Sequence, residues 1–248
     1  MYGTGKNGAR HYGELITNSP FIWNVDSDNI IVEDNVLDRL VAPLIADVSI
    51  NISIPMTDLD AKASSFNNWI SLVEISKVES MFNKQSINKD GYILLKDMDY
   101  GLTNCALVRR SAIEMVGGYD SDVRTLYRLR RAALSKGVVD TKSHLYHNQV
   151  DSIFKYLQKW NRRLKFFGKM NEDDLKKYFV EYPPNSDEHK RLQGGLLKDI
   201  FEYLIVSSTM FRGTGDRRWL WGLIYPFAII AVGLLHPIRN FSVFKKFL

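Results

Sequence analysis

Two aspartates separated by one residue are the side chains of this sequence best suited to hold a cation. Asp26 and Asp28 follow the apolar run PFIWNV of residues 20–25, which is typical of a buried strand. Buried without partners, such carboxylates cost on the order of several kcal/mol, but in a crevice they can share a divalent cation. Carboxylate oxygens suit Mg²⁺ or Mn²⁺, which usually complete their shells with substrate phosphates. The pair therefore predicts a metal site that holds a diphosphate.

The same segment also fits an interpretation without metal chemistry. The residues D-S-D-N are common in turns, and Asp28 or Asn29 is a suitable helix cap. The following segment, residues 34–44, has the pattern of a helix with acids in its first turn. On this second interpretation the aspartates only shape the path of the backbone.

Three further segments place the aspartates in an ordered set of motifs. GKNGARHYG (residues 5–13) precedes them, GGYDSD (117–122) and LYRLRR (126–131) follow, and LYHNQ (145–149) comes last. In this order the motifs resemble the family 2 glycosyltransferases of the GT-A fold, including the membrane-attached polyprenyl-phosphate sugar transferases. The resemblance covers roughly residues 5–165.

The resemblance implies a role for each matching residue. Asp28 would be a direct metal ligand, Asp26 would contact the sugar or ribose of the donor, and Arg10 would meet its phosphate. Asp122 matches the catalytic acid that deprotonates the acceptor hydroxyl, and His147 matches a histidine that serves some members as a further metal ligand. Each residue also has a structural alternative: Asp122 as a turn residue, His147 as a hydrogen-bonded core histidine, and Arg10 as a solvated cation.

The implied reaction is direct displacement at the anomeric carbon of a nucleotide sugar. The implied acceptor is a lipid or glycan near a membrane, with a polyprenyl phosphate as one example. Two departures from the family pattern stand against this expectation. The acidic motif is short and has Ser121 where a glutamate is common. The family also has further strands and helices before the G-x-x-x-A-R segment, so this chain would correspond to an N-terminally truncated enzyme. The alternative is a non-catalytic remnant that binds a partner subunit or a membrane.

Alternating helix-like and strand-like segments predict an α/β fold. From the resemblance we expect a partial GT-A (Rossmann-like) mixed sheet flanked by helices. Residues 45–55 alternate apolar and polar as a half-buried strand does, and residues 64–82 fit an amphipathic helix. A capping box from Ser111 to Glu114 predicts the start of a short helix. The remaining expected elements are helices over 8–16 and 34–44 and strands over 20–25 and 104–108.

Residues 219–238 contain no Asp, Glu, Lys or Arg and predict a C-terminal hydrophobic membrane helix. As a helix this segment reaches about 30 Å, the thickness of the hydrocarbon layer. Trp219, Trp221 and Tyr225 gather at one end as an interfacial belt would. The alternative is a buried core helix kinked at Pro226.

Charge and composition divide the chain into three parts. The net charge of +5 arises entirely after Ser207, so a nucleic-acid footprint spread over a folded surface is not expected. Residues 1–149 would form the C-terminal part of a GT-A domain. Residues 150–200 would form a basic amphipathic helix and a linker at 183–191, and residues 201–248 a hydrophobic membrane-associating tail.

The single cysteine and the polar N-terminal segment favour a reducing compartment for the body. Cys105 has no second cysteine with which to form an internal disulfide, and MYGTGKNGARHYG lacks the apolar stretch of a signal peptide. We therefore expect a membrane-attached protein whose catalytic body faces the cytoplasm.

Overall fold

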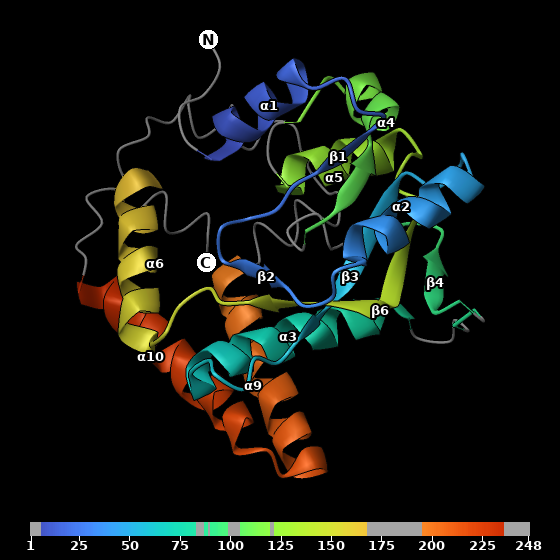
Figure 1. Cartoon of the computed structure of the whole chain (residues 1–248). Helices are drawn as coiled ribbons and strands as arrows, with labels where there is room; N and C mark the ends of the chain where they lie inside the picture. The colour runs from blue at the N-terminus through green and yellow to red at the C-terminus, as the bar shows by residue number, and fades with distance from the viewer. Residues whose placement is uncertain are drawn as a thin grey trace. The chain divides into compact units, whose positions relative to one another are not determined.

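Figure 1 shows the computed structural model of the chain. It describes residues 6–82, 87–88, 90–98, 105–119, 122–167 and 195–235. The chain divides into two units, Met1–Lys62 with Ile70–Gln149 and Ala63–Trp69 with Val150–Leu248. The predicted linker at residues 183–191 lies outside the described residues.

The first unit is a mixed α/β structure, as the sequence predicts. Residues 65–69 of its helix α3 belong to the second unit. Its elements are α1 (Lys6–Ile16), β1 (Phe21–Trp23), β2 (Asn29–Ile31), α2 (Val36–Ala46), β3 (Ile52–Asp58), α3 (Ser65–Phe82), β4 (Tyr92–Leu95), β5 (Leu107–Arg109), α4 (Arg110–Met115), α5 (Asp122–Arg131) and β6 (Gly137–His147).

The strands form one curled mixed sheet in the order β1-β5-β3-β6-β2, and β4 also pairs with β6. Strands β3 and β6 are parallel. The pairs β1–β5, β2–β6, β3–β5 and β4–β6 are antiparallel. The long strand β6 joins the sheet together, because its first residues pair with β4 and its last residues pair with β2.

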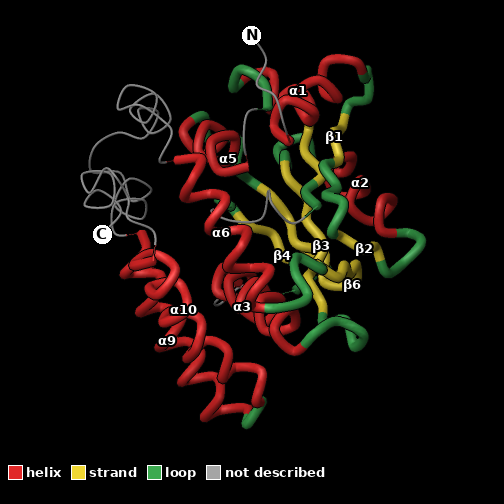
Figure 2. The backbone as a smooth tube through the Cα atoms, turned by 90° about the vertical axis from the view of Figure 1, so that its left-hand side faces the viewer, coloured by secondary structure: helices red, strands yellow, loops and turns green. Residues whose placement is uncertain are grey.

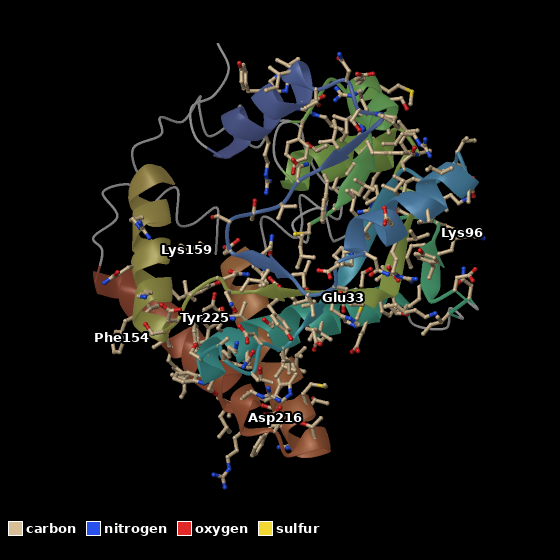
Figure 3. The ribbon with its side chains drawn as sticks, viewed as in Figure 1. Glu33, Lys96, Phe154, Lys159, Asp216 and Tyr225 are labelled. Atoms are coloured by element: carbon tan, nitrogen blue, oxygen red, sulfur yellow. The ribbon has the colours of Figure 1, made fainter. Side chains whose placement is uncertain are left out.

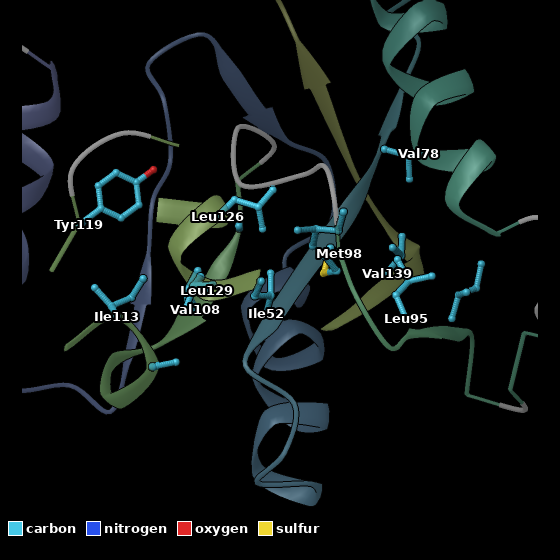
Figure 4. Close-up of a cluster of buried hydrophobic side chains, with 14 residues drawn as sticks. Ile52, Val78, Leu95, Met98, Val108, Ile113, Tyr119, Leu126, Leu129 and Val139 are labelled. Atoms are coloured by element: carbon cyan, nitrogen blue, oxygen red, sulfur yellow. The ribbon is translucent and has the colours of Figure 1, made fainter. Parts of the chain in front are cut away.

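Helices cover both faces of this sheet. Figure 2 shows the strands between α2 on one side and α3 and α5 on the other. Successive strand residues face opposite sides, so Leu107 and Val138 pack in the α2 core, whereas Val108 and Val139 pack in the other core. Figure 4 shows this second core. The prediction that residues 45–55 form a half-buried strand is therefore wrong, since residues 52–55 of β3 are all buried.

Two local predictions also differ from the structure. Helix α4 begins at Arg110, so Ser111 lies inside the helix and cannot be the N-cap of a capping box. Helix α3 ends where predicted and begins one residue later, but it is not simply amphipathic, because residues 66–71 are all buried, polar ones included.

A bulge divides β6 into two halves. Pro55 of β3 pairs with Asp140, but the next residue, Met56, pairs with His144. The fully buried carboxylate of Asp140 accepts hydrogen bonds from the Arg39 guanidinium, with Nε at 2.7 Å, and from Ser143 Oγ at 2.5 Å. These bonds fix the backbone at the point where the strand leaves its register.

The second unit is helical. Beside residues 63–69 its elements are α6 (Ile153–Phe167), α9 (Gly195–Thr214), the 3-10 helix η1 (Arg217–Leu220) and α10 (Trp221–Leu235). Helices α9 and α10 pack closely at Gly222, where an added Cβ would lie 1.7 Å from Ser207 Oγ.

Aromatic side chains pack inside the second unit. The rings of Trp69 and Tyr225 lie 5.2 Å apart, those of Phe66 and Trp221 lie 5.3 Å apart, and Trp219 is buried. Trp221 and Tyr225 therefore contact rings of α3, which differs from the predicted gathering at a membrane interface. No helix within the described ranges is long and apolar enough to cross a membrane.

Candidate functional site

The two aspartates lie on a turn that joins β1 to β2. The amide of Asn29 donates to the carbonyl of Asp26 at 3.0 Å, and strand β2 begins at Asn29. The turn interpretation is thus right for the backbone, although the turn leads into a strand and not directly into the helix. This strand was not predicted, since its three residues give too short a pattern to recognise.

Asp26 belongs to a group of side chains drawn from three sequence motifs. Its carboxylate forms an ion pair with the Arg10 guanidinium of α1. Arg10 Nη1 also donates to the Tyr119 hydroxyl at 3.1 Å, and its guanidinium lies 5.6 Å from the centre of that ring. The Tyr119 amide donates to Glu14 Oε2 of α1 at 2.9 Å.

The glycines before Tyr119 explain how the chain reaches this position. Gly117 and Gly118 both have φ of +88°, a left-handed conformation that glycine adopts without steric cost. An added Cβ at Gly118 would also lie 3.1 Å from the His11 ring. The G-x-x-x-A-R, D-x-D and G-G-Y segments therefore meet around Arg10.

Asp28 belongs to a second group at the adjoining end of the sheet. Its Oδ1 lies 3.7 Å from His147 Nε2, and its carbonyl accepts from the Asn148 amide at 2.8 Å. The other ring nitrogen, His147 Nδ1, lies 2.9 Å from Glu74 Oε2 of α3. Gln149 Nε2 donates to Glu74 Oε1 at 2.7 Å. His147 thus lies between two carboxylates, one at each ring nitrogen.

The two carboxylates control the charge of His147. Burial alone would lower the pKa of this imidazole, but Asp28 and Glu74 raise the pKa to about 9. In the absence of a metal the ring is therefore a cation at neutral pH, and its Nε2 proton lies on the side of Asp28.

The spacing of Asp28 and His147 fits a shared divalent cation. A cation bonded to both atoms at about 2.1 Å needs them between about 3.0 and 4.2 Å apart, depending on the angle. The observed 3.7 Å lies within this range. The Nδ1 contact with Glu74 is the carboxylate contact that metal-binding histidines usually have.

Asp26 is less available for such an ion, because Arg10 already neutralises it. Across the described residues, no group of three or more His, Cys, Asp or Glu side chains could hold a metal ion. The protein would therefore supply two ligands to the cation, Asp28 and His147. Water and substrate oxygens would complete the coordination shell, as is usual for Mg²⁺.

The predicted catalytic acid is only partly described. Asp122 is the first residue of α5, but its side chain lies outside the described part of the structure. The structure thus brings Arg10 to Asp26 and Asp28 to His147, and gives no position for the Asp122 carboxylate.

Sequence reasoning missed Glu74, Gln149 and Tyr119. A signal for Glu74 was present in α3, because Asn67, Ser71 and Glu74 recur at spacings of four and three residues and all are buried. A buried polar stripe on a helix indicates bonds to partners on another element. Gln149 lies within the LYHNQ segment, and Tyr119 is the aromatic residue of G-G-Y.

Cys105 lies close to the aspartates but is not a reactive group. The thiol is buried, and this burial, with the nearby charges of Asp26 and Asp28, raises its pKa to about 12. Such a thiol is almost entirely protonated at neutral pH.

No family model matches this sequence, and a search of curated proteins finds no match.

Proposed function

We propose that this chain is a metal-dependent glycosyltransferase domain, or the C-terminal part of one, related to family 2 of the GT-A fold. It would transfer a sugar from a nucleotide-sugar donor to an acceptor near a membrane. The observation that carries the proposal is the meeting of Arg10, Asp26 and Tyr119, which come from three motifs far apart in the sequence.

Different residues of the site would bind the donor and the cation. Asp26, held by Arg10, presents carboxylate oxygens to hydroxyl groups of the donor sugar or ribose. Asp28 and His147 would hold Mg²⁺ or Mn²⁺. The bound cation would offset the negative charge of the departing nucleotide diphosphate. Asp122 remains the predicted base for the acceptor hydroxyl.

Calorimetry of the full chain with Mn²⁺ and a panel of nucleoside diphosphate sugars tests this proposal. We expect saturable heat with at least one donor, and loss of that heat on adding a chelator or on the substitution Asp28→Asn. The exposed neighbour Asp34 supplies the control, because Asp34→Asn should leave the heat unchanged. Absence of heat with every donor would refute the transferase proposal.

Attachment to a membrane forms a separate part of the proposal. Exposed apolar side chains on the second unit support it: Phe154 on α6 is 75% exposed (Figure 3), and Phe227 on α10 is 68% exposed. Exposed basic residues at Arg212 and Arg217 suit anionic head groups. The body of the protein would then lie on the cytoplasmic side of the membrane.

Flotation of the full chain with phosphatidylserine-containing vesicles tests membrane attachment. Phe227→Glu should reduce the floated fraction. Ile45→Glu should not, although Ile45 on α2 of the first unit is equally exposed at 68%. Equal flotation of both variants, or none for the natural chain, would contradict membrane binding through α10.

A second candidate is a non-catalytic partner-binding subunit. Strand β2 lies at one end of the strand order, and Ile30, Ile31 and Val32 are 47%, 38% and 41% exposed. An exposed apolar edge strand is a surface to which another chain can add a strand. This candidate predicts no heat with any donor, together with self-association in sedimentation that Ile30→Lys abolishes.

A further inference from the structure

Glu74 is a buried carboxylate whose bonds all point toward the end of β6. Its side chain is 10% exposed, so its charge requires partners inside the protein. Oε1 and Oε2 lie 3.0 and 2.9 Å from His147 Nδ1, and Oε1 also accepts from Gln149 Nε2 at 2.7 Å.

These contacts form a closed group of three side chains. Gln149 Nε2 and His147 Nδ1 are themselves 3.2 Å apart, so both nitrogens share the same carboxylate. Because Glu74 accepts the proton of Nδ1, this ring nitrogen is a donor and is not available as a ligand. The opposite nitrogen, Nε2, faces Asp28 at 3.7 Å.

We propose that Glu74, supported by Gln149, is the positioning residue that fixes the ring orientation of His147 and holds the proton on Nδ1. In this arrangement Nε2 and Asp28 Oδ1 form a ligand pair for a hard divalent cation. The inference rests on the proposed function, since it assigns the cation site of that function. It adds that the site depends on a residue of α3, which belongs to none of the sequence motifs.

The chemistry of the carboxylate makes specific substitutions informative. Glu74→Gln keeps the volume but replaces one acceptor oxygen by an NH₂ group, which would face the donors of His147 and Gln149. Glu74→Ala removes both acceptors and frees the ring to rotate. Glu79→Gln is the matched control, because Glu79 lies on the same helix but is exposed.

The experiment measures Mn²⁺ binding to the full chain by electron paramagnetic resonance, with circular dichroism as the check of folding. We expect Glu74→Ala to weaken Mn²⁺ binding about 10- to 100-fold, as the loss of a carboxylate partner of a metal-bound histidine usually does. The Mn²⁺ affinity of Glu74→Gln should lie between those of Glu74→Ala and the natural chain. Pulsed measurements should show ¹⁴N coupling from a histidine ligand in the natural chain and in Glu79→Gln. This coupling should be lost in Glu74→Ala.

The outcomes separate the two proposals. If the natural chain binds Mn²⁺ but the Glu74 variants keep its affinity and ¹⁴N coupling, the positioning role is wrong and the metal site stands. If the natural chain binds no Mn²⁺, both the metal-dependent function and the positioning role are wrong. If Glu74→Ala does not fold, Glu74→Gln and Gln149→Leu give the same comparison, and unchanged coupling in both would overturn the inference.

Discussion

The charge of His147 should make the metal-free protein more stable in mild acid than in mild alkali. The pKa of His147 is raised from 6.5 to about 9 by Asp28 and Glu74, despite the opposing effect of burial. A raised pKa means that the folded state binds the proton more tightly than the unfolded state. The stabilisation is therefore complete below about pH 6.5 and is lost as the pH rises through about 9. The difference between these values corresponds to about 3 kcal/mol of unfolding free energy.

Urea unfolding of the full chain in the presence of a chelator measures this effect. Near-UV and far-UV circular dichroism should be followed together, because coincident transitions are needed to extract one free energy. We expect the unfolding free energy to fall by up to about 3 kcal/mol between about pH 6.5 and pH 9.5.

Two histidine variants isolate the contribution of His147. His147→Gln should remove most of the pH dependence. His144→Gln should retain it, although His144 lies on the same strand and its Nδ1 contacts Glu33 at 2.7 Å. If the natural chain and His147→Gln lost stability in parallel over this range, the account of the Asp28–His147–Glu74 group would be wrong.

Three further predictions concern the surrounding structure. Arg39→Met should cost about 3–5 kcal/mol in urea unfolding because it leaves the fully buried Asp140 without its cation, and the double variant with Asp140→Leu should regain much of this loss. Cys105 should react with a thiol reagent at least about 100-fold more slowly in the folded chain than in urea, since its pKa is about 12; equal rates would contradict its burial. Gly222→Ala should lower stability by about 1–3 kcal/mol through the clash with Ser207, and thermal melts should show that adding Ser207→Gly restores it.

Local patterns were sufficient to predict most of the helices and the coarse fold. The periodicity of residues 8–16, 34–44 and 64–82 corresponds to α1, α2 and α3. The apolar run at 20–25 contains β1, and the run at 104–108 overlaps β5. These elements are recognisable because their own side chains carry the period of a helix or a strand. The mixed α/β class is confirmed on this basis.

Features that depend on distant pairing were not predictable in the same way. Strand β2 is defined by its register with Leu145–His147, more than one hundred residues away in the sequence. The half-buried prediction for β3 failed because Ser53 and Thr57 are themselves buried, so the polar positions do not mark a solvent face.

The candidate site was likewise predictable only in part from the sequence. The motifs indicated Asp26 and Arg10, and they assigned Asp28 and His147 to one cation, but they did not indicate that Asp26 would pair with Arg10. Which carboxylate receives which partner depends on how α1 and β6 meet the turn. Glu74 could be noticed as a polar residue of an apolar helix, but its partner was visible only in three dimensions.

The bulge of β6 has a consequence for how related sequences would diverge. It lies between the half of β6 that is buried in the core and the half that presents His147 beside Asn29. Since neighbouring strand residues face opposite sides, inserting or deleting one residue here would turn His147 to the other face, whereas a change of two would move it by about 7 Å along the same face. Homologues that differ only in the length of this bulge would keep the same hydrophobic core but lose or relocate the histidine. An alignment gap at residues 141–143 would therefore distinguish such lineages.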